Sequence, residues 1–286
     1  ENNMSMEVAL SVDNMNLADA MGFSASTASS SGGNSNLHRV TVTVIQEVHS
    51  DTNKIVSSPV FKIKKGEDYF YSREIEVRLF AERQRWQRWD SENNTFQKTV
   101  MSTNLNTDLK DTLGTFNLGR RTGYIKDFNG LPETTKDIIR SVNRVKVYMG
   151  MVRVSEPFYE GGTPVEDYES EIPFIADVKN RESLKSIDGV VSKLMNKRIS
   201  PVEHTITLTG DVRAMPNGNK YAVIQASLNE LSSINEGDNE VLQNFVSYVE
   251  NQNTSILGIW DEKHVDKLDG ESSKIVSNIV DLEDFE

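Results

Sequence analysis

Residues 69–98 read YFYSREIEVRLFAERQRWQRWDSENNTFQK. Apolar and polar side chains alternate from Ile75 to Ala81, which is the period of a β-strand with one buried face. The polar run at 90–94 predicts a turn, and residues 96–101 then return as a hairpin partner. This stretch therefore predicts a long strand that ends in a hairpin, and it indicates a strand-dominated fold.

The same alternation recurs on both sides of this stretch, while a period near 3.6 marks a few helices. The expected strands are 38–48, 54–64, 144–154, 172–179, 201–209 and 221–228, and the expected helices are 131–141, 181–197 and 238–251. The chain is predicted to be an α+β, strand-dominated protein with about three helices. An OB-like Greek-key barrel elaborated with these helices is compatible with the patterns, although the patterns do not require it.

The two ends of the chain differ in composition from the middle. The segment 24–36 (SASTASSSGGNSN) has the composition of a flexible linker, and we predict a flexible N-terminal arm over 1–36. Its short apolar motif at 16–23 (NLADAMGF) either docks on a neighbouring subunit, giving self-association, or is disordered. The core domain is expected at 37–260 and an acidic, mostly disordered C-terminal tail at 261–286.

Net charge does not exclude a polyanionic partner. The 286 residues carry 31 Lys and Arg against 43 Asp and Glu, a net charge of −12. Residues 60–153 alone carry 18 bases and 12 acids, which is +6, whereas residues 236–286 carry 3 bases and 13 acids, which is −10. Such asymmetry suggests a polyanion-binding body with an acidic tail, and the alternative is a solvated surface whose charges cluster.

Several classes of protein are disfavoured. The chain has no cysteine, which excludes disulfides, a thiol nucleophile and cysteine-ligated metals. Neither a signal peptide nor an apolar run of roughly 18 residues is visible, so we expect no membrane partner and a location in the cytoplasm. The four histidines are scattered, and the acidic run 166–171 is typical of a solvated loop. We expect no enzyme, no cofactor and no metal.

Aromatic and basic residues are interleaved through 69–98. Aromatic rings stack on nucleic-acid bases and Arg or Lys neutralises phosphates, so this mixture is typical of a surface that binds single-stranded nucleic acid. The alternative is that the aromatics are core residues or cross-strand hairpin pairs. The candidate stacking residues are Tyr69, Tyr71, Phe80, Trp86, Trp89 and Phe96, and the candidate phosphate contacts are Arg78, Arg83, Arg85, Arg88 and Lys98.

A second basic motif lies at 119–126 (GRRTGYIK), where Arg120, Arg121 and Lys126 are candidate phosphate contacts. It is not a Walker loop, because no Lys-Ser or Lys-Thr pair follows its second glycine. A solvated turn is the alternative.

The end of the chain combines acids with apolar anchors, a pattern typical of peptide docking. It could also compete with DNA for a basic groove, or serve only for solubility. The residues concerned are Asp281, Leu282, Glu283, Asp284 and Phe285.

The aromatic–basic hairpin, the NLADAMGF arm, the segment 100–131 (VMSTNLNTDLKDTLGTFNLGRRTGYIKDFNGL) and the stretch from Leu228 onward are similar to a family of marine tailed-phage proteins, over about residues 16–260. The layout also resembles phage and bacterial single-stranded-DNA-binding proteins, which have an OB-type body and an acidic tail with a near-terminal Phe. It departs from them because Glu286 follows Phe285. The resemblance implies coating of unwound DNA during replication or recombination, without catalysis. The alternatives are a structural or assembly protein of a phage particle and a strand-annealing recombination mediator.

Overall fold

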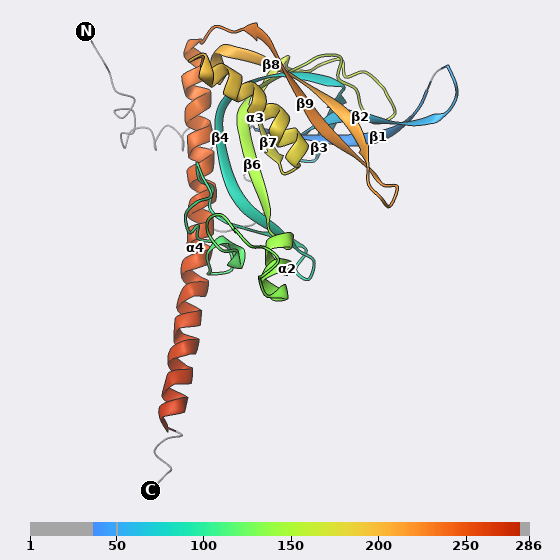
Figure 1. Ribbon diagram of the computed structural model, residues 1–286. Coiled ribbons are helices and arrows are strands. Elements are labelled where there is room, and N and C mark those ends of the chain that lie inside the picture. The colour runs from blue at the N-terminus through green and yellow to red at the C-terminus, as the bar shows by residue number, and fades with distance from the viewer. Residues whose placement is uncertain (1–36, 50, 281–286) are drawn as a thin grey trace, which may run out of the picture. The chain divides into compact units, whose positions relative to one another are not determined.

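The computed structural model describes residues 37–49 and 51–280, with side chains up to His264 (Figure 1). The described chain forms β1 (His38–Val48), β2 (Ile55–Lys65), β3 (Asp68–Ser72), β4 (Glu74–Asp90), β5 (Thr95–Lys98), α2 (Glu133–Ser141), β6 (Asn143–Val154), β7 (Glu171–Val178), α3 (Arg181–Asn196), β8 (His204–Ala214), β9 (Lys220–Leu231) and α4 (Glu236–Val280), with single 3-10 turns at Asn117–Gly119 and Pro201–Glu203. The predicted α+β, strand-dominated class is confirmed.

The described strands form one mixed sheet in the order β3-β2-β1-β7-β6-β4-β8-β9, with β5 paired to β4. Neighbouring strands β1 and β2, β2 and β3, β4 and β8, and β8 and β9 are antiparallel, whereas β1 runs parallel to β7. This order runs from β3 to β9 without closing on itself. The sheet of the described residues is therefore open.

The chain divides into two compact units. The first contains the described residues up to Glu82 together with Val147–Tyr248, and the second contains Arg83–Lys146 together with α4 from Val249. The second unit extends past residue 260, the predicted end of the core domain, and β4, β6 and α4 each contribute residues to both units.

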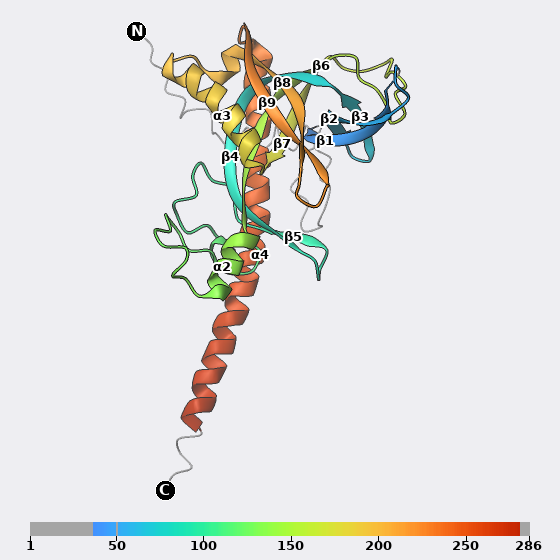
Figure 2. The same ribbon diagram turned by 45° about the vertical axis from the view of Figure 1, so that its right-hand side comes forward.

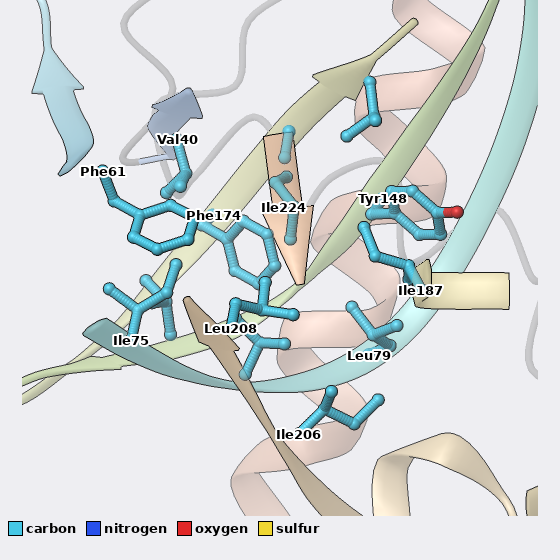
Figure 3. Close-up of a cluster of buried hydrophobic side chains, with 14 of the residues drawn as sticks. Val40, Phe61, Ile75, Leu79, Tyr148, Phe174, Ile187, Ile206, Leu208 and Ile224 are labelled. Carbon is cyan, nitrogen blue, oxygen red and sulfur yellow. The ribbon is translucent and has the colours of Figure 1, made fainter. Parts of the chain in front are cut away.

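In the first unit, strands at opposite ends of the sheet pack against each other across a shared apolar core. Gly210 of β8 lies so close to β2 that a Cβ built on it would be 2.5 Å from the Cβ of Pro59. Burying a large aliphatic or aromatic side chain stabilises a fold by about 1.5–3 kcal/mol. The core shown in Figure 3 includes Val40, Phe61, Ile75, Tyr148, Phe174, Ile187, Leu208 and Ile224.

Helix α3 covers the free edge of β9. Its apolar side, including Ile187 and Leu194, is buried, and its Ser183 and Ser186 hydroxyl oxygens accept hydrogen bonds of 2.8 Å from the backbone N–H groups of Ile224 and Ala226. An uncovered edge strand invites pairing with another chain, so these bonds satisfy donors that would otherwise be open to strand addition.

A buried ion pair ties the start of α4 to β4 within the first unit. The Arg78 guanidinium donates to both carboxylate oxygens of Asp238, at 3.0 and 2.9 Å, and lies 3.5 Å from Glu171. The side chains of Arg78 and Asp238 are only 5% and 7% exposed. Hydrogen bonds from Arg78 hold the pKa of Asp238 below its usual value, which keeps this carboxylate charged in the interior.

In the second unit, two buried polar residues organise the long connection between β5 and α2. The Asp111 carboxylate accepts hydrogen bonds from the N–H groups of Leu113, Thr115 and Leu118, and the Asn117 amide bonds to the backbone of Leu109. These bonds replace the regular backbone pairing that this irregular segment lacks.

Helix α4 also anchors the connection between β5 and α2. The Asn253 side chain exchanges two hydrogen bonds with the backbone of Met101, at 2.7 and 3.0 Å. The Trp260 indole donates to the carbonyl of Thr115 at 2.8 Å, and Lys110 lies 3.9 Å over its ring. Trp260, the third tryptophan of the chain, is thus a packing residue.

The end of the chain differs from the prediction. A helix was expected at 238–251 and a mostly disordered tail from 261, but α4 is a single helix from Glu236 to Val280, so the prediction of disorder is wrong for residues 261–280. The N-terminal arm, 1–36, and the docking residues of the last segment, 281–286, lie outside the described residues. Within the described part of the chain, no helix combines the length and apolar character needed to cross a membrane.

Candidate nucleic-acid interface

The end of β4 and all of β5 form a two-stranded hairpin in the second unit (Figure 2). Its turn is fixed by Asp90, whose carboxylate accepts hydrogen bonds from Glu92, Asn93 and Gln97. The bonds from Asn93 are the main reason that the pKa of Asp90 lies below its usual value. Asn94 adopts the left-handed backbone conformation, with φ of 51°, that closes the turn. The hairpin end is therefore held by side chains and does not rely on backbone pairing alone.

One face of this hairpin presents an aromatic pair. Trp89 lies directly opposite Phe96, with ring centroids 4.7 Å apart and an interplanar angle of 68°. Each residue is 48% exposed. The next pair on the same face is Gln87 with Lys98, because side chains two residues apart on a strand share a face. An exposed aromatic pair with a lysine beside it is the geometry that base stacking and phosphate contact require.

The opposite face carries different chemistry. Trp86 is three residues from Trp89, an odd spacing that places the two rings on opposite faces of the strand. Arg88 and Gln97 form the cross-strand pair on this face, where Arg88 donates to the Gln97 amide oxygen at 2.9 and 2.5 Å. The Arg120 guanidinium lies over the Trp86 ring, 4.6 Å from its centroid. Partial burial lowers the pKa of Arg120.

The loop after Arg120 carries exposed groups. Arg121, Tyr124 and Lys126 are exposed, Tyr124 to 89%, and they make no hydrogen bond or ion pair with other residues that the structure describes. Thr122, between them, is held by Asn117 at 2.9 Å and by Asp108. Two cations and an aromatic ring thus project from a loop whose base is fixed.

The electrostatics of this segment favour an anionic partner. Arg83–Lys146 contains 12 Lys and Arg against 7 Asp and Glu, a net charge of +5. Six of the 7 acids are engaged within the segment: four accept hydrogen bonds, and Glu133 and Asp137 pair with Arg140. The four are Asp90, Asp108, Asp111 and Asp127. The charge that remains available is therefore mainly positive.

Three aromatics from the predicted set lie in the first unit. Tyr71 is buried and packs on Phe158 with ring centroids 5.8 Å apart. The Tyr69 hydroxyl donates to Glu160 at 2.8 Å, and Phe80 packs edge-on against an α4 ring. These three aromatics lie in the first unit, whereas Trp89 and Phe96 of the hairpin lie in the second.

The predicted cations also differ in exposure. Arg78 is buried in its ion pair with Asp238 and so is not available to a phosphate in this structure. Arg85 is also buried and donates to Gln87 at 3.1 Å. Arg83 and Lys98 are half-buried at the hairpin, and the Lys98 ammonium lies 3.5 Å from an amide oxygen of α4.

Tyr124 is an exposed aromatic that is missing from the predicted stacking residues. A signal was available, because this tyrosine follows Gly123 in a loop rich in glycine and arginine.

Comparisons with protein-family models, with curated proteins and with solved structures give no match to this chain. Within the described residues, no cluster of three or more His, Asp or Glu side chains could hold a metal ion. The candidate interface therefore depends on its own geometry.

Proposed function

We propose that this protein binds single-stranded DNA without strong sequence preference, using the second unit. The observation that carries the proposal is the exposed, mutually packed pair of Trp89 and Phe96 at the end of a hairpin, in a segment of net charge +5. Isolated exposed aromatics are common, but a pre-formed pair in the same unit as a loop whose two cations make no ion pair with other described residues matches the two requirements of single-strand binding.

The chemistry follows from the residue types. Every base has an aromatic face, so stacking on Trp89 or Phe96 does not depend on base identity. In a duplex the bases already stack on each other, and the hairpin aromatics would have to compete with that stacking. Arg121 and Lys126 would neutralise backbone phosphates, which makes binding weaken with salt. The protein would coat unwound DNA during phage replication or recombination.

The resemblance to phage and bacterial single-stranded-DNA-binding proteins supports this proposal through layout alone. The OB-like barrel that the resemblance implies remains a prediction, since the described sheet is open. The proposal does not depend on it, because the hairpin and the loop supply the binding groups. Docking of replication or recombination proteins on the last residues also remains a prediction.

The test is a titration of labelled oligo-dT with the full chain at about 50 mM salt and at higher salt, where binding should fall steeply. The double variant Trp89→Ala with Phe96→Ala should bind more weakly, with unchanged circular dichroism. Tyr159→Ala is a matched control, because Tyr159 is equally exposed and lies in the first unit. Absence of binding by the wild-type chain at about 50 mM salt would refute the proposal.

A second candidate is a structural or assembly role in a phage particle. It is motivated by the 45 residues of α4, a length well beyond the roughly 8–20 residues of typical globular helices. Purified particles would contain the protein if this role is correct, whereas a replication protein would be absent from them.

A further inference from the structure

We infer that Trp86 and Arg120 are a positioning pair that holds the loop of Arg121, Tyr124 and Lys126 beside the hairpin, and that Trp89 rather than Trp86 stacks on a base. The inference rests on the proposed function and assigns separate tasks to two tryptophans and two arginines that are close together in the sequence. It also predicts that Arg120 acts on DNA only through the loop.

One face of the Trp86 ring is already covered. Arg120 lies 4.6 Å from its centroid and covers one of its faces. A base could stack on that face only after displacing a guanidinium that already makes a favourable cation–π contact. The Trp89 ring instead meets Phe96 edge-to-face and is 48% exposed, so it stays accessible to a base.

The two arginines of the loop differ in their contacts. Arg120 has an extended backbone, with φ of −76° and ψ of 137°. Its side chain lies over Trp86 and donates to the carbonyl of Ile139 at 3.4 Å. Arg121, the next residue, is exposed and makes no hydrogen bond or ion pair with other described residues.

Other hydrogen bonds hold the loop at its two ends. Thr122 is bonded to Asn117 and to Asp108, and the next hydrogen bond along the described chain joins the Gly130 N–H to the Asp127 carboxylate. Gly123 has φ of +83° and open space around it, so the chain is free to turn there. Losing the Arg120 side chain therefore removes the contacts with Trp86 and Ile139 and leaves the segment that carries both exposed cations held by Thr122 and by the Asp127 turn.

Stacking by Trp89 and positioning by Arg120 predict different changes of affinity and salt slope in titrations of oligo-dT. For single strands, log K falls against log salt with a slope of about −0.7 for each phosphate neutralised. Trp89→Ala should weaken binding by ~5- to 150-fold and leave the slope unchanged. Arg120→Gln should reduce the slope by about 1.4, the share of two phosphates, because Arg121 and Lys126 are no longer held in place.

A mutant cycle separates positioning from direct contact. If Arg120 positions the loop, adding Arg121→Gln and Lys126→Gln to Arg120→Gln should change the slope no further. If Arg120 itself contacts a phosphate, the losses should add, and this result would overturn the inference. Arg120→Lys, which keeps a cation over Trp86, should restore most of the wild-type slope. The control is Arg144→Gln, an exposed cation of the same unit.

Limited trypsin digestion tests the same pair without DNA. Arg120→Gln should speed cleavage after Arg121 and Lys126 several-fold over wild type, whereas Arg144→Gln should not. Equal cleavage rates in both variants would overturn the positioning role. Failure of the wild-type chain to bind oligo-dT would refute the proposed function and with it the role on DNA, while the digestion would still decide whether Arg120 holds the loop.

Discussion

Replacing Asp238 by Asn should strongly destabilise the first unit. Asp238 accepts two hydrogen bonds from Arg78 at 3.0 and 2.9 Å, and it also accepts one from the backbone N–H of Asn235 just before α4. Asparagine has nearly the same size but no charge, so the substitution changes electrostatics without opening a cavity. It leaves the Arg78 guanidinium, whose side chain is 5% exposed, without its principal partner.

The magnitude follows from this burial. Removing one partner of a buried ion pair costs about 3–5 kcal/mol, mainly because a charge is left uncompensated in the interior. Arg78 keeps one further carboxylate partner, Glu171 at 3.5 Å, whose side chain is 35% exposed. This remaining contact places the expected loss near the lower end, about 3 kcal/mol.

The pH dependence has a defined sign. The pKa of Asp238 is lower in the folded chain than its ordinary value, so the pair contributes fully above about pH 3.9. Its contribution is lost as the pH falls from there through the folded pKa, where the carboxylate takes up a proton. The wild-type chain should therefore lose more stability than Asp238→Asn when both are taken below this pH.

Urea unfolding followed by circular dichroism measures both effects. Tryptophan fluorescence is not suitable, because all three tryptophans lie in the second unit and would not report on the first. Glu133→Gln is the control, since it removes a carboxylate whose ion pair with Arg140 is exposed and should leave the midpoint unchanged. A loss below about 1 kcal/mol for Asp238→Asn would show that the reasoning from burial is wrong.

Three further outcomes are expected. Trp89→Ala should weaken oligo-dT binding by about 1–3 kcal/mol in a fluorescence-anisotropy titration with unchanged circular dichroism, and wild-type affinity would contradict base stacking there. Arg121→Gln with Lys126→Gln should reduce the salt slope by about 1.4, and an unchanged slope would show that neither cation meets a phosphate. Gly114→Ala should destabilise the fold by about 1–3 kcal/mol in urea, because φ is +69° and the new Cβ would lie 2.8 Å from an α4 side chain. Gly123→Ala, with φ of +83° but open space, should have the smaller effect, and equal losses would contradict the close approach.

Local periodicity predicted much of the fold. The alternation at 38–48 coincides with β1, the pattern at 144–154 is β6 within one residue, and the helical period at 181–197 is α3. These elements each bury one face, so their patterns are strong. By contrast, the apolar pattern that predicts 238–251 fades further along the chain, and residues 252–280 of α4 were missed.

The candidate interface was predictable only in part. The hairpin and its aromatics follow from alternation and from the turn at 90–94, and the period of two already implies that Trp86 and Trp89 face opposite ways. The burial of Arg78 was not predictable, because its partner Asp238 is 160 residues away in the sequence. Interleaved aromatics and cations look the same in a sequence whether a cation faces solvent or a distant carboxylate.

The distribution of charge decides whether an acidic protein can bind DNA at all. Screening limits the reach of a charge to about 8–10 Å at ordinary salt, so a phosphate responds to the segment that it touches rather than to the net −12. Arg83–Lys146 presents +5, and its exposed Arg121 and Lys126 make no ion pair with other described residues. The acids elsewhere in the chain repel DNA only within the same short range. Strong salt dependence together with modest affinity is therefore the behaviour that this charge distribution predicts.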